Sequence, residues 1–167
     1  MSFRLFIYYC AFTGGWAALV GWALGRVADT NSPVFNAGVK GMFLGMLVAA
    51  GLGLVDALLT LDIRQIGSVL TRVGVTVVVG LFGGLFGGVV GQALYGLTNL
   101  APFLIVGWTL TGFLIGAAIG VFDLLARLLK HEDTSGAMKK VINGVIGGTV
   151  GGLLGGILSV VLGGIWT

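Results

Sequence analysis

The sequence predicts an all-α integral membrane protein with five transmembrane helices, in which a glycine-rich helical hairpin is duplicated in tandem behind one extra helix. Of the 167 residues, 57% are hydrophobic and only 9% are charged, whereas soluble domains carry about 25% charged residues. The apolar residues form long uncharged runs, and about 20 such residues cross the hydrocarbon core of a bilayer. Glycines and one aspartate also return at a constant spacing in the second half of the chain.

Five apolar runs define the expected spans. They cover residues 5–25, 41–61, 73–98, 103–126 and 141–166. The first run exceeds the 7–15 residues of a signal-peptide core and lacks a convincing cleavage site, so we expect it to be retained as a helix. Pro33 and Pro102 fall in connections, where proline is least disruptive. The expected divisions are residues 1–40 for the first helix and outer loop, 41–102 for hairpin repeat 1 and 103–167 for hairpin repeat 2.

The basic residues predict the orientation. The seven on one side of the predicted bilayer are Arg4, Arg64, Arg72, Arg127, Lys130, Lys139 and Lys140. The two on the other side are Arg26 and Lys40. Because cytoplasmic loops carry the excess of Lys and Arg, the N-terminus is predicted inside and the C-terminus outside. Aromatic residues near the predicted outer helix ends suggest an interfacial belt: Trp22, Tyr95, Trp108 and Trp166.

The chain repeats itself. Residues 41–59 align with residues 108–126 at an offset of 67, which places Asp56 on Asp123. Residues 72–91 align with residues 140–159 at an offset of 68, which places Arg72 on Lys140. Both copies enter the membrane from the same side, so their pseudo-axis is predicted along the membrane normal. The stretch GGWAALVGWALG in the first span resembles the second helix of the hairpin, as half a repeat.

The glycines recur at the spacing of one helix face. The two sets are Gly80, Gly83, Gly84, Gly87, Gly88 and Gly91, and Gly144, Gly147, Gly148, Gly151, Gly152, Gly155 and Gly156. Spacings of three and four residues fit a helix and not a strand. In water each helical glycine costs about 1 kcal/mol relative to alanine. In lipid a bare stripe allows another helix backbone to approach closely, so we interpret these glycines as helix-packing residues.

Catalytic and cofactor motifs are not evident. No glycine run has the order of a phosphate-binding loop. His131 is the only histidine and lies in a polar KHED loop, and Cys10 is the only cysteine and lies in an apolar run. A metal site therefore lacks ligands, and we expect neither an enzyme nor a cofactor. The sequence also argues against nucleic acid as a partner, because no basic patch alternates with aromatic residues.

Two carboxylates stand out at equivalent repeat positions. Asp56 and Asp123 fall inside predicted spans, near the expected cytoplasmic ends. Intramembrane carboxylates are functional candidates. One interpretation is a structural clamp. Asp123 would pair with Arg127 along its helix, and across the hairpins Asp56 would reach Arg72 and Asp123 would reach Lys140. The other interpretation is proton or ion handling by the same residues.

The opening FRLFIYYCAFTGGWAALVGWALGR (3–26) carries a family resemblance. It resembles the start of glycine-zipper multi-span segments in planctomycete-type bacterial membrane proteins, some of which carry a forkhead-associated domain. This resemblance implies a bacterial inner membrane and no particular activity. A likeness to rotary ATPase proteolipids fails, because those carry their carboxylate in mid-membrane on the second helix of the hairpin, whereas here it lies on the first.

The expected function follows from the helix faces. Stripes of small residues on every span indicate a non-enzymatic scaffold or assembly subunit, which packs in the lipid bilayer as a homo-oligomer or within a larger membrane complex. The alternative is an ion or small-solute channel or transporter subunit that uses Asp56 and Asp123.

Overall fold

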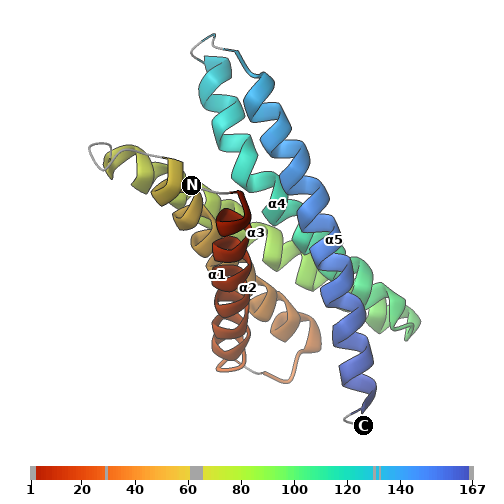
Figure 1. Cartoon of the computed structure of the whole chain (residues 1–167). Coiled ribbons are helices and arrows are strands. Elements are labelled where there is room, and N and C mark those ends of the chain that lie inside the picture. The colour runs from red at the N-terminus through yellow and green to blue at the C-terminus, as the bar shows by residue number, and fades with distance from the viewer. Residues whose placement is uncertain (1–2, 29, 61–65, 130, 132, 166–167) are drawn as a thin grey trace.

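A computed structural model describes residues 3–28, 30–60, 66–129, 131 and 133–165, which form α-helices and no strand. The prediction of an all-α chain is confirmed. Figure 1 shows the five helices, each of which runs back along its predecessor. Their bounds are α1 Phe3–Gly25, α2 Pro33–Thr60, α3 Ile66–Thr98, α4 Pro102–Leu129 and α5 Ser135–Ile165.

The helices are longer than the predicted spans because local capping, and not hydropathy, sets their ends. Helix α2 begins at Pro33 and not at residue 41, since proline suits the first helical position. Ser32 precedes it, and its Oγ accepts a 3.4 Å hydrogen bond from the Phe35 amide. Helix α3 begins at Ile66, before the span predicted at residues 73–98, and the apolar stretch Val73–Thr98 within it has the predicted bounds. It ends before Asn99, whose φ of 55° is the left-handed conformation common after a helix.

Helices pack on their neighbours in sequence. Helix α2 lies against α3 and α4 lies against α5, which gives two hairpins, while α1 packs on α2 and α3 packs on α4. In Figure 1 the α2–α3 hairpin crosses the α4–α5 hairpin obliquely. The α2 and α3 ends at Thr60 and Ile66 lie toward the same end of the molecule as the α4 and α5 ends at Leu129 and Ser135.

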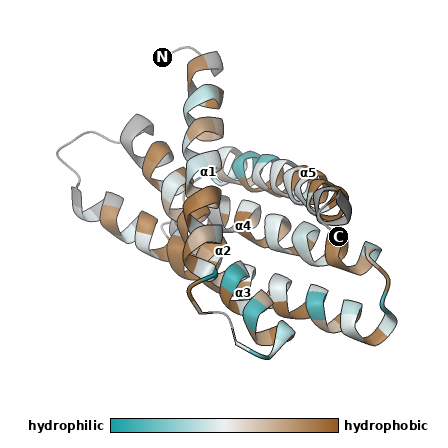
Figure 2. Cartoon of the chain, turned by 90° about the horizontal axis from the view of Figure 1, so that it is seen from below, coloured by the Kyte–Doolittle hydropathy of each residue, from teal (hydrophilic) through white to brown (hydrophobic). Residues whose placement is uncertain are grey.

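The surface of the bundle is apolar, as expected for a bilayer setting. Four stretches are long and apolar enough to cross a membrane: Ile7–Gly25, Pro33–Val55, Val73–Thr98 and Ser135–Val161, and Pro102–Ala117 is a shorter apolar helical stretch. Figure 2 shows hydrophobic residues along all five helices. Large apolar side chains such as Phe82, Phe86 and Leu154 are more than half exposed. Such a surface indicates an integral membrane protein.

The interior contains few large side chains. The buried apolar residues of the described chain are Ala49, Val55, Ile115 and Ala137, and the buried polar ones are Thr76 and Thr111. Both threonines donate to a carbonyl of their own helix, at 2.9 Å from Thr76 to Val73 and at 3.0 Å from Thr111 to Gly107. The helices therefore meet through backbone and small residues, with the bulky side chains outside.

Candidate functional site

Glycine meets glycine where α2 crosses α3. A Cβ built at Gly45 would overlap the carbonyl oxygen of Gly80 and lie 3.0 Å from the Gly84 Cα. A Cβ at Gly84 would overlap the Gly41 carbonyl oxygen and lie 2.7 Å from the Gly41 carbonyl carbon. Backbone therefore contacts backbone directly, and even a methyl group cannot be added without moving a helix. This geometry allows dispersion and Cα–H···O contacts along the crossing.

The same contacts recur between α4 and α5. Gly112 meets Gly148 as Gly45 meets Gly80, and an offset of 67 on the first helix and 68 on the second relates the pairs. A Cβ at Gly120 would lie 2.6 Å from the Val141 Cα, and one at Gly53 would lie 3.8 Å from the Val73 Cα, again at equivalent positions. Equivalent residues of the two hairpins thus make equivalent helix–helix contacts.

A second glycine face of α3 contacts α4. Gly83, Gly87 and Gly91 are all buried. A Cβ at Gly83 would lie 2.8 Å from the Leu114 Cβ, and one at Gly91 would lie 2.7 Å from the Gly107 Cα. Helix α3 is therefore bare on two faces, one for each neighbour.

Helix α1 contacts α2 in the manner in which α3 contacts α4. A Cβ at Gly21 would lie 2.7 Å from the Leu44 Cα, and one at Gly25 would lie 2.7 Å from the Lys40 Cα. Leu44 and Lys40 are the repeat equivalents of Thr111 and Gly107, which Gly87 and Gly91 of α3 contact. The α1–α2 and α3–α4 junctions therefore use the same face of the helix that follows.

The corresponding face of α5 is uncovered. Gly151 and Gly155 are the repeat equivalents of Gly83 and Gly87, yet both are exposed, with no atom of the described chain within 4 Å of an added Cβ. Gly147 and Ser159 extend this face by one turn in each direction and are also exposed. Gly144, Gly148, Gly152 and Gly156 lie on the covered side. One of the two glycine faces of α5 thus has no partner within the described chain.

The proposed charge clamp falls mostly outside what the structure describes. The backbones of Asp56, Arg72 and Asp123 lie in α2, α3 and α4, but their side chains are not among those described. The Arg127 guanidinium donates a 3.1 Å hydrogen bond to the Asp133 carbonyl oxygen, and Lys140 is half-buried. The clamp and the ion-handling interpretation therefore both stay predictions.

The connection between α4 and α5 is organised by Asp133. Its carboxylate accepts a 2.7 Å hydrogen bond from the Ser135 hydroxyl and a 3.0 Å hydrogen bond from the Ser135 amide. These bonds, the hydroxyl first, hold the pKa of the Asp133 carboxyl below its usual value. The amide bond also occupies a donor at the start of α5 that has no partner within the helix.

His131 and Cys10 lie apart from any metal-ligand set. His131 is exposed and has a φ of 55° just after α4 ends, and Cys10 is half-buried in α1. Within the described residues, no three His, Cys, Asp or Glu side chains gather as a metal site would require. Trp108 is half-buried and lines a cavity, and the aromatic-belt interpretation stays a prediction.

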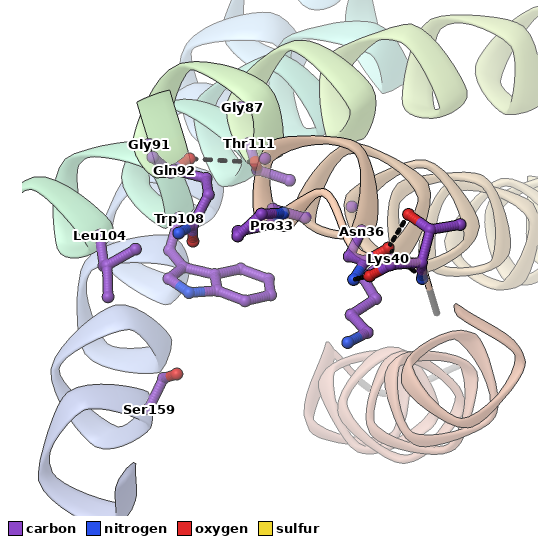
Figure 3. A pocket seen from close by; sticks show the side chains of 15 residues that line it. Pro33, Asn36, Lys40, Gly87, Gly91, Gln92, Leu104, Trp108, Thr111 and Ser159 are labelled. Carbon is purple, nitrogen blue, oxygen red and sulfur yellow. Dashed lines mark hydrogen bonds between the residues drawn. The ribbon is translucent and has the colours of Figure 1, made fainter. Parts of the chain in front are cut away.

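A cavity of about 430 Å³ lies among α2, α3, α4 and α5. Its polar lining comes from Asn36, Lys40, Gln92, Trp108 and Ser159, with Thr30 and Thr111 beside them. Figure 3 shows Lys40 and Trp108 projecting from different helices into this space. Sequence reasoning did not identify this group. The available signal was a departure from the repeat, since Asn36, Lys40 and Gln92 correspond to Phe103, Gly107 and Val160.

Comparison with protein-family models, curated proteins and solved structures found no match for the chain.

Proposed function

We propose that this protein is a non-enzymatic integral membrane scaffold or assembly subunit, which associates with further helices through its glycine faces. The observation that carries the proposal is the uncovered face of α5. Gly151 and Gly155 are exposed, whereas their equivalents Gly83 and Gly87 are buried against α4. A stripe of small residues four apart is the surface on which transmembrane helices associate.

A second copy of the chain is the partner that this face favours. Within the chain, a glycine face of α1 is covered by α2 and one of α3 is covered by α4. The surfaces of α2 and α4 that make these contacts are therefore already occupied and cannot cover the α5 face. The α5 face can still meet the same face of another α5, because two bare stripes related by a two-fold axis are complementary. In that arrangement the copies share one orientation in the membrane, as parallel glycine-motif dimers require.

We further infer that all five helices cross the bilayer, as one half-repeat followed by two duplicated hairpins. The equivalent contacts of Gly45 with Gly80 and of Gly112 with Gly148 support the duplication. The ends of both hairpins lie toward one end of the molecule, and the basic residues flanking them support a cytoplasmic location for that end. The N-terminus is then inside, the C-terminus outside, and the bacterial inner membrane the proposed location.

The test compares Gly151→Leu with Gly96→Leu. Both glycines are exposed, and an added Cβ at either would have no neighbour among the described residues within 4 Å. Gly96 lies near the end of α3 and is not part of the α5 face. Protein extracted gently from its native membrane is sized, and the co-purifying chains are identified. We expect a species larger than the monomer that Gly151→Leu dissociates and Gly96→Leu preserves. A monomer with no associated protein, or equal effects of the two substitutions, would refute the proposal.

A further inference from the structure

Asn143 continues the uncovered glycine face of α5 by one turn toward the start of the helix. It lies four residues before Gly147, which is followed at the same spacing by Gly151 and Gly155, and all four residues are exposed. The Asn143 side chain makes no hydrogen bond to the described part of the chain. A side-chain amide carries two donor hydrogens and an acceptor oxygen. The bare face of α5 therefore ends in a polar group whose hydrogen-bonding capacity the described residues leave unused.

The surroundings of Asn143 on α5 are apolar. It falls within the stretch Ser135–Val161, which is long and apolar enough to cross a membrane. Ile142 and Ile146, on neighbouring faces of the helix, are exposed apolar side chains. Hydrocarbon offers an amide no hydrogen-bond partner, and polar side chains of transmembrane helices hydrogen-bond to other helices. Contact with lipid therefore does not account for an amide at this position, whereas contact with a further helix does.

The repeat shows that this end of the α5 face differs from its counterpart in α3. At the offset of 68, Asn143 corresponds to Val75 and Gly147 corresponds to Val79, and both valines are half-buried. Relative to α3, helix α5 thus has an amide at one position and no side chain one turn later. The missing side chain allows a second helix to approach closely beside Asn143. These two changes fit a partner that meets an amide, and a helix with the apolar surface that Leu114 of α4 presents to Gly83 does not.

We propose that Asn143 hydrogen-bonds to the Asn143 of a second copy, and that this pair fixes the register and the parallel direction in which two α5 helices associate. The inference rests on the self-association of α5 proposed above. Two identical amides related by a two-fold axis can each donate to the other. Parallel helices that meet along a row of small residues four apart cross at about −40°.

The crossing angle also places the charge that follows Asn143 on the same row. If the closest approach is at Gly147, Asn143 lies about 6 Å from it along the helix and Lys139 about 12 Å, at 1.5 Å per residue. Because crossed helices diverge on either side of their closest approach, the two amides stay near each other while the two ammonium groups separate. Lys139 is exposed, and its flexible stem lets its charge reach the headgroup region.

The first experiment measures the dissociation constant of the dimer by sedimentation equilibrium of the full chain in neutral detergent micelles. Asn143→Val installs the residue of α3 and is expected to raise the dissociation constant about fivefold, as the loss of an interhelical hydrogen-bonded pair implies. The matched control is the double variant Asn143→Val/Ile142→Asn, which keeps the composition and moves the amide by one residue to another exposed face. We expect this variant to dimerise as weakly as Asn143→Val.

The second experiment reads the register by oxidative cross-linking in native membranes, in a Cys10→Ala background. Asn143→Cys is expected to form an interchain disulfide, and Ile142→Cys to form it much more slowly. In an antiparallel pair centred on Gly151, two residues 143 would lie about 24 Å apart along the helix, and Asn143→Cys would instead link to Ser159→Cys of the second copy. That antiparallel pattern, or equal cross-linking at 142 and 143, would overturn the inference.

The outcomes separate this inference from the proposed function. A wild-type chain that does not self-associate would refute both. A wild-type dimer that Gly151→Leu dissociates, but that neither Asn143→Val nor the double variant weakens, would overturn the role of Asn143 and leave the glycine face of α5 as the contact. Loss of the dimer in Asn143→Val, with recovery in the double variant, would also overturn it, because the amide would then act without regard to its place on the helix.

Discussion

Adjacent glycines in α5 offer a direct measurement of backbone contact. Gly152 faces α4, where a Cβ would lie 2.5 Å from the Trp108 carbonyl oxygen and 3.0 Å from the Thr109 Cα. Gly151 is next to it in sequence and exposed, and no described atom of another helix lies within 4 Å of a Cβ built there. Replacing each with alanine therefore adds the same methyl group at the same depth of the same helix, once into backbone and once into open space.

The magnitude follows from the geometry. Alanine favours the helix over glycine by about 1 kcal/mol, and both variants share this gain, so it cancels in their difference. At Gly152 the methyl-to-oxygen distance must open from 2.5 Å to at least 3.0 Å, and this requires one helix backbone to move by roughly 0.5 Å. Overpacking of this kind costs about 1–3 kcal/mol. Gly152→Ala is therefore expected to be less stable than Gly151→Ala by that amount.

The assay is unfolding by dodecyl sulfate in mixed micelles, at a protein concentration low enough to keep the chain monomeric. Fluorescence from Trp108 reports the contact directly when Trp16, Trp22 and Trp166 are replaced with phenylalanine. Unfolding free energies of the two alanine variants within about 0.5 kcal/mol of each other, the usual scatter of additive substitutions, would refute the reasoning that α4 and α5 touch through backbone.

Three further predictions address other parts of the fold. Gly38→Ala would place a methyl group 2.8 Å from the Val89 Cγ2, the one atom of another described helix within 4 Å. Val89→Ala should relieve this strain, and a double-mutant cycle should show a coupling energy of about 1 kcal/mol, whereas additive effects would contradict the contact. Because the pKa of Asp133 is lowered in the folded state, its stabilising effect is present above the unfolded pKa of about 3.9 and lost as pH falls through the folded pKa; Asp133→Asn should therefore reduce the acid-side loss of thermal stability, and an unchanged profile would exclude this role. In a Cys10→Ala background, a cysteine at Asn99 should react with an impermeant thiol reagent added outside intact cells and one at Ser135 should not, and the reverse pattern would invert the proposed topology.

The helical class was predictable because the apolar runs are long and nearly free of charge. The run of residues 5–25 falls wholly within α1, and the run of residues 73–98 falls wholly within α3. The helices begin before the predicted spans, because hydropathy indicates where lipid contact begins and capping sets where helical hydrogen bonding begins. At α2 the pair Ser32–Pro33 is a capping signal that stands in the sequence eight residues before the span predicted from residue 41.

The spacing of the glycines could not predict which neighbouring helix, if any, covers each glycine face. Gly83 and Gly151 are equivalent in the repeat and have the same spacing to neighbouring glycines, yet one is buried and the other exposed. The difference lies in the neighbouring helix, because Leu114 of α4 lies against Gly83 and no atom of the described chain lies within 4 Å of a Cβ at Gly151. The cavity was missed for a related reason, because its lining residues come from four helices and are far apart in sequence.

The glycine-on-glycine crossings also affect how the hairpins come together. Burying a leucine or isoleucine orders its rotamers at about 0.5–1 kcal/mol, and a glycine has no rotamers to order. At the contacts of Gly45 with Gly80 and of Gly112 with Gly148, association of the helices therefore costs no side-chain entropy at these glycines. It restricts the motion of two helices that are already formed. Because no rotamers at these positions have to be selected after the helices meet, correct pairing depends on the register in which the two helices first come into contact.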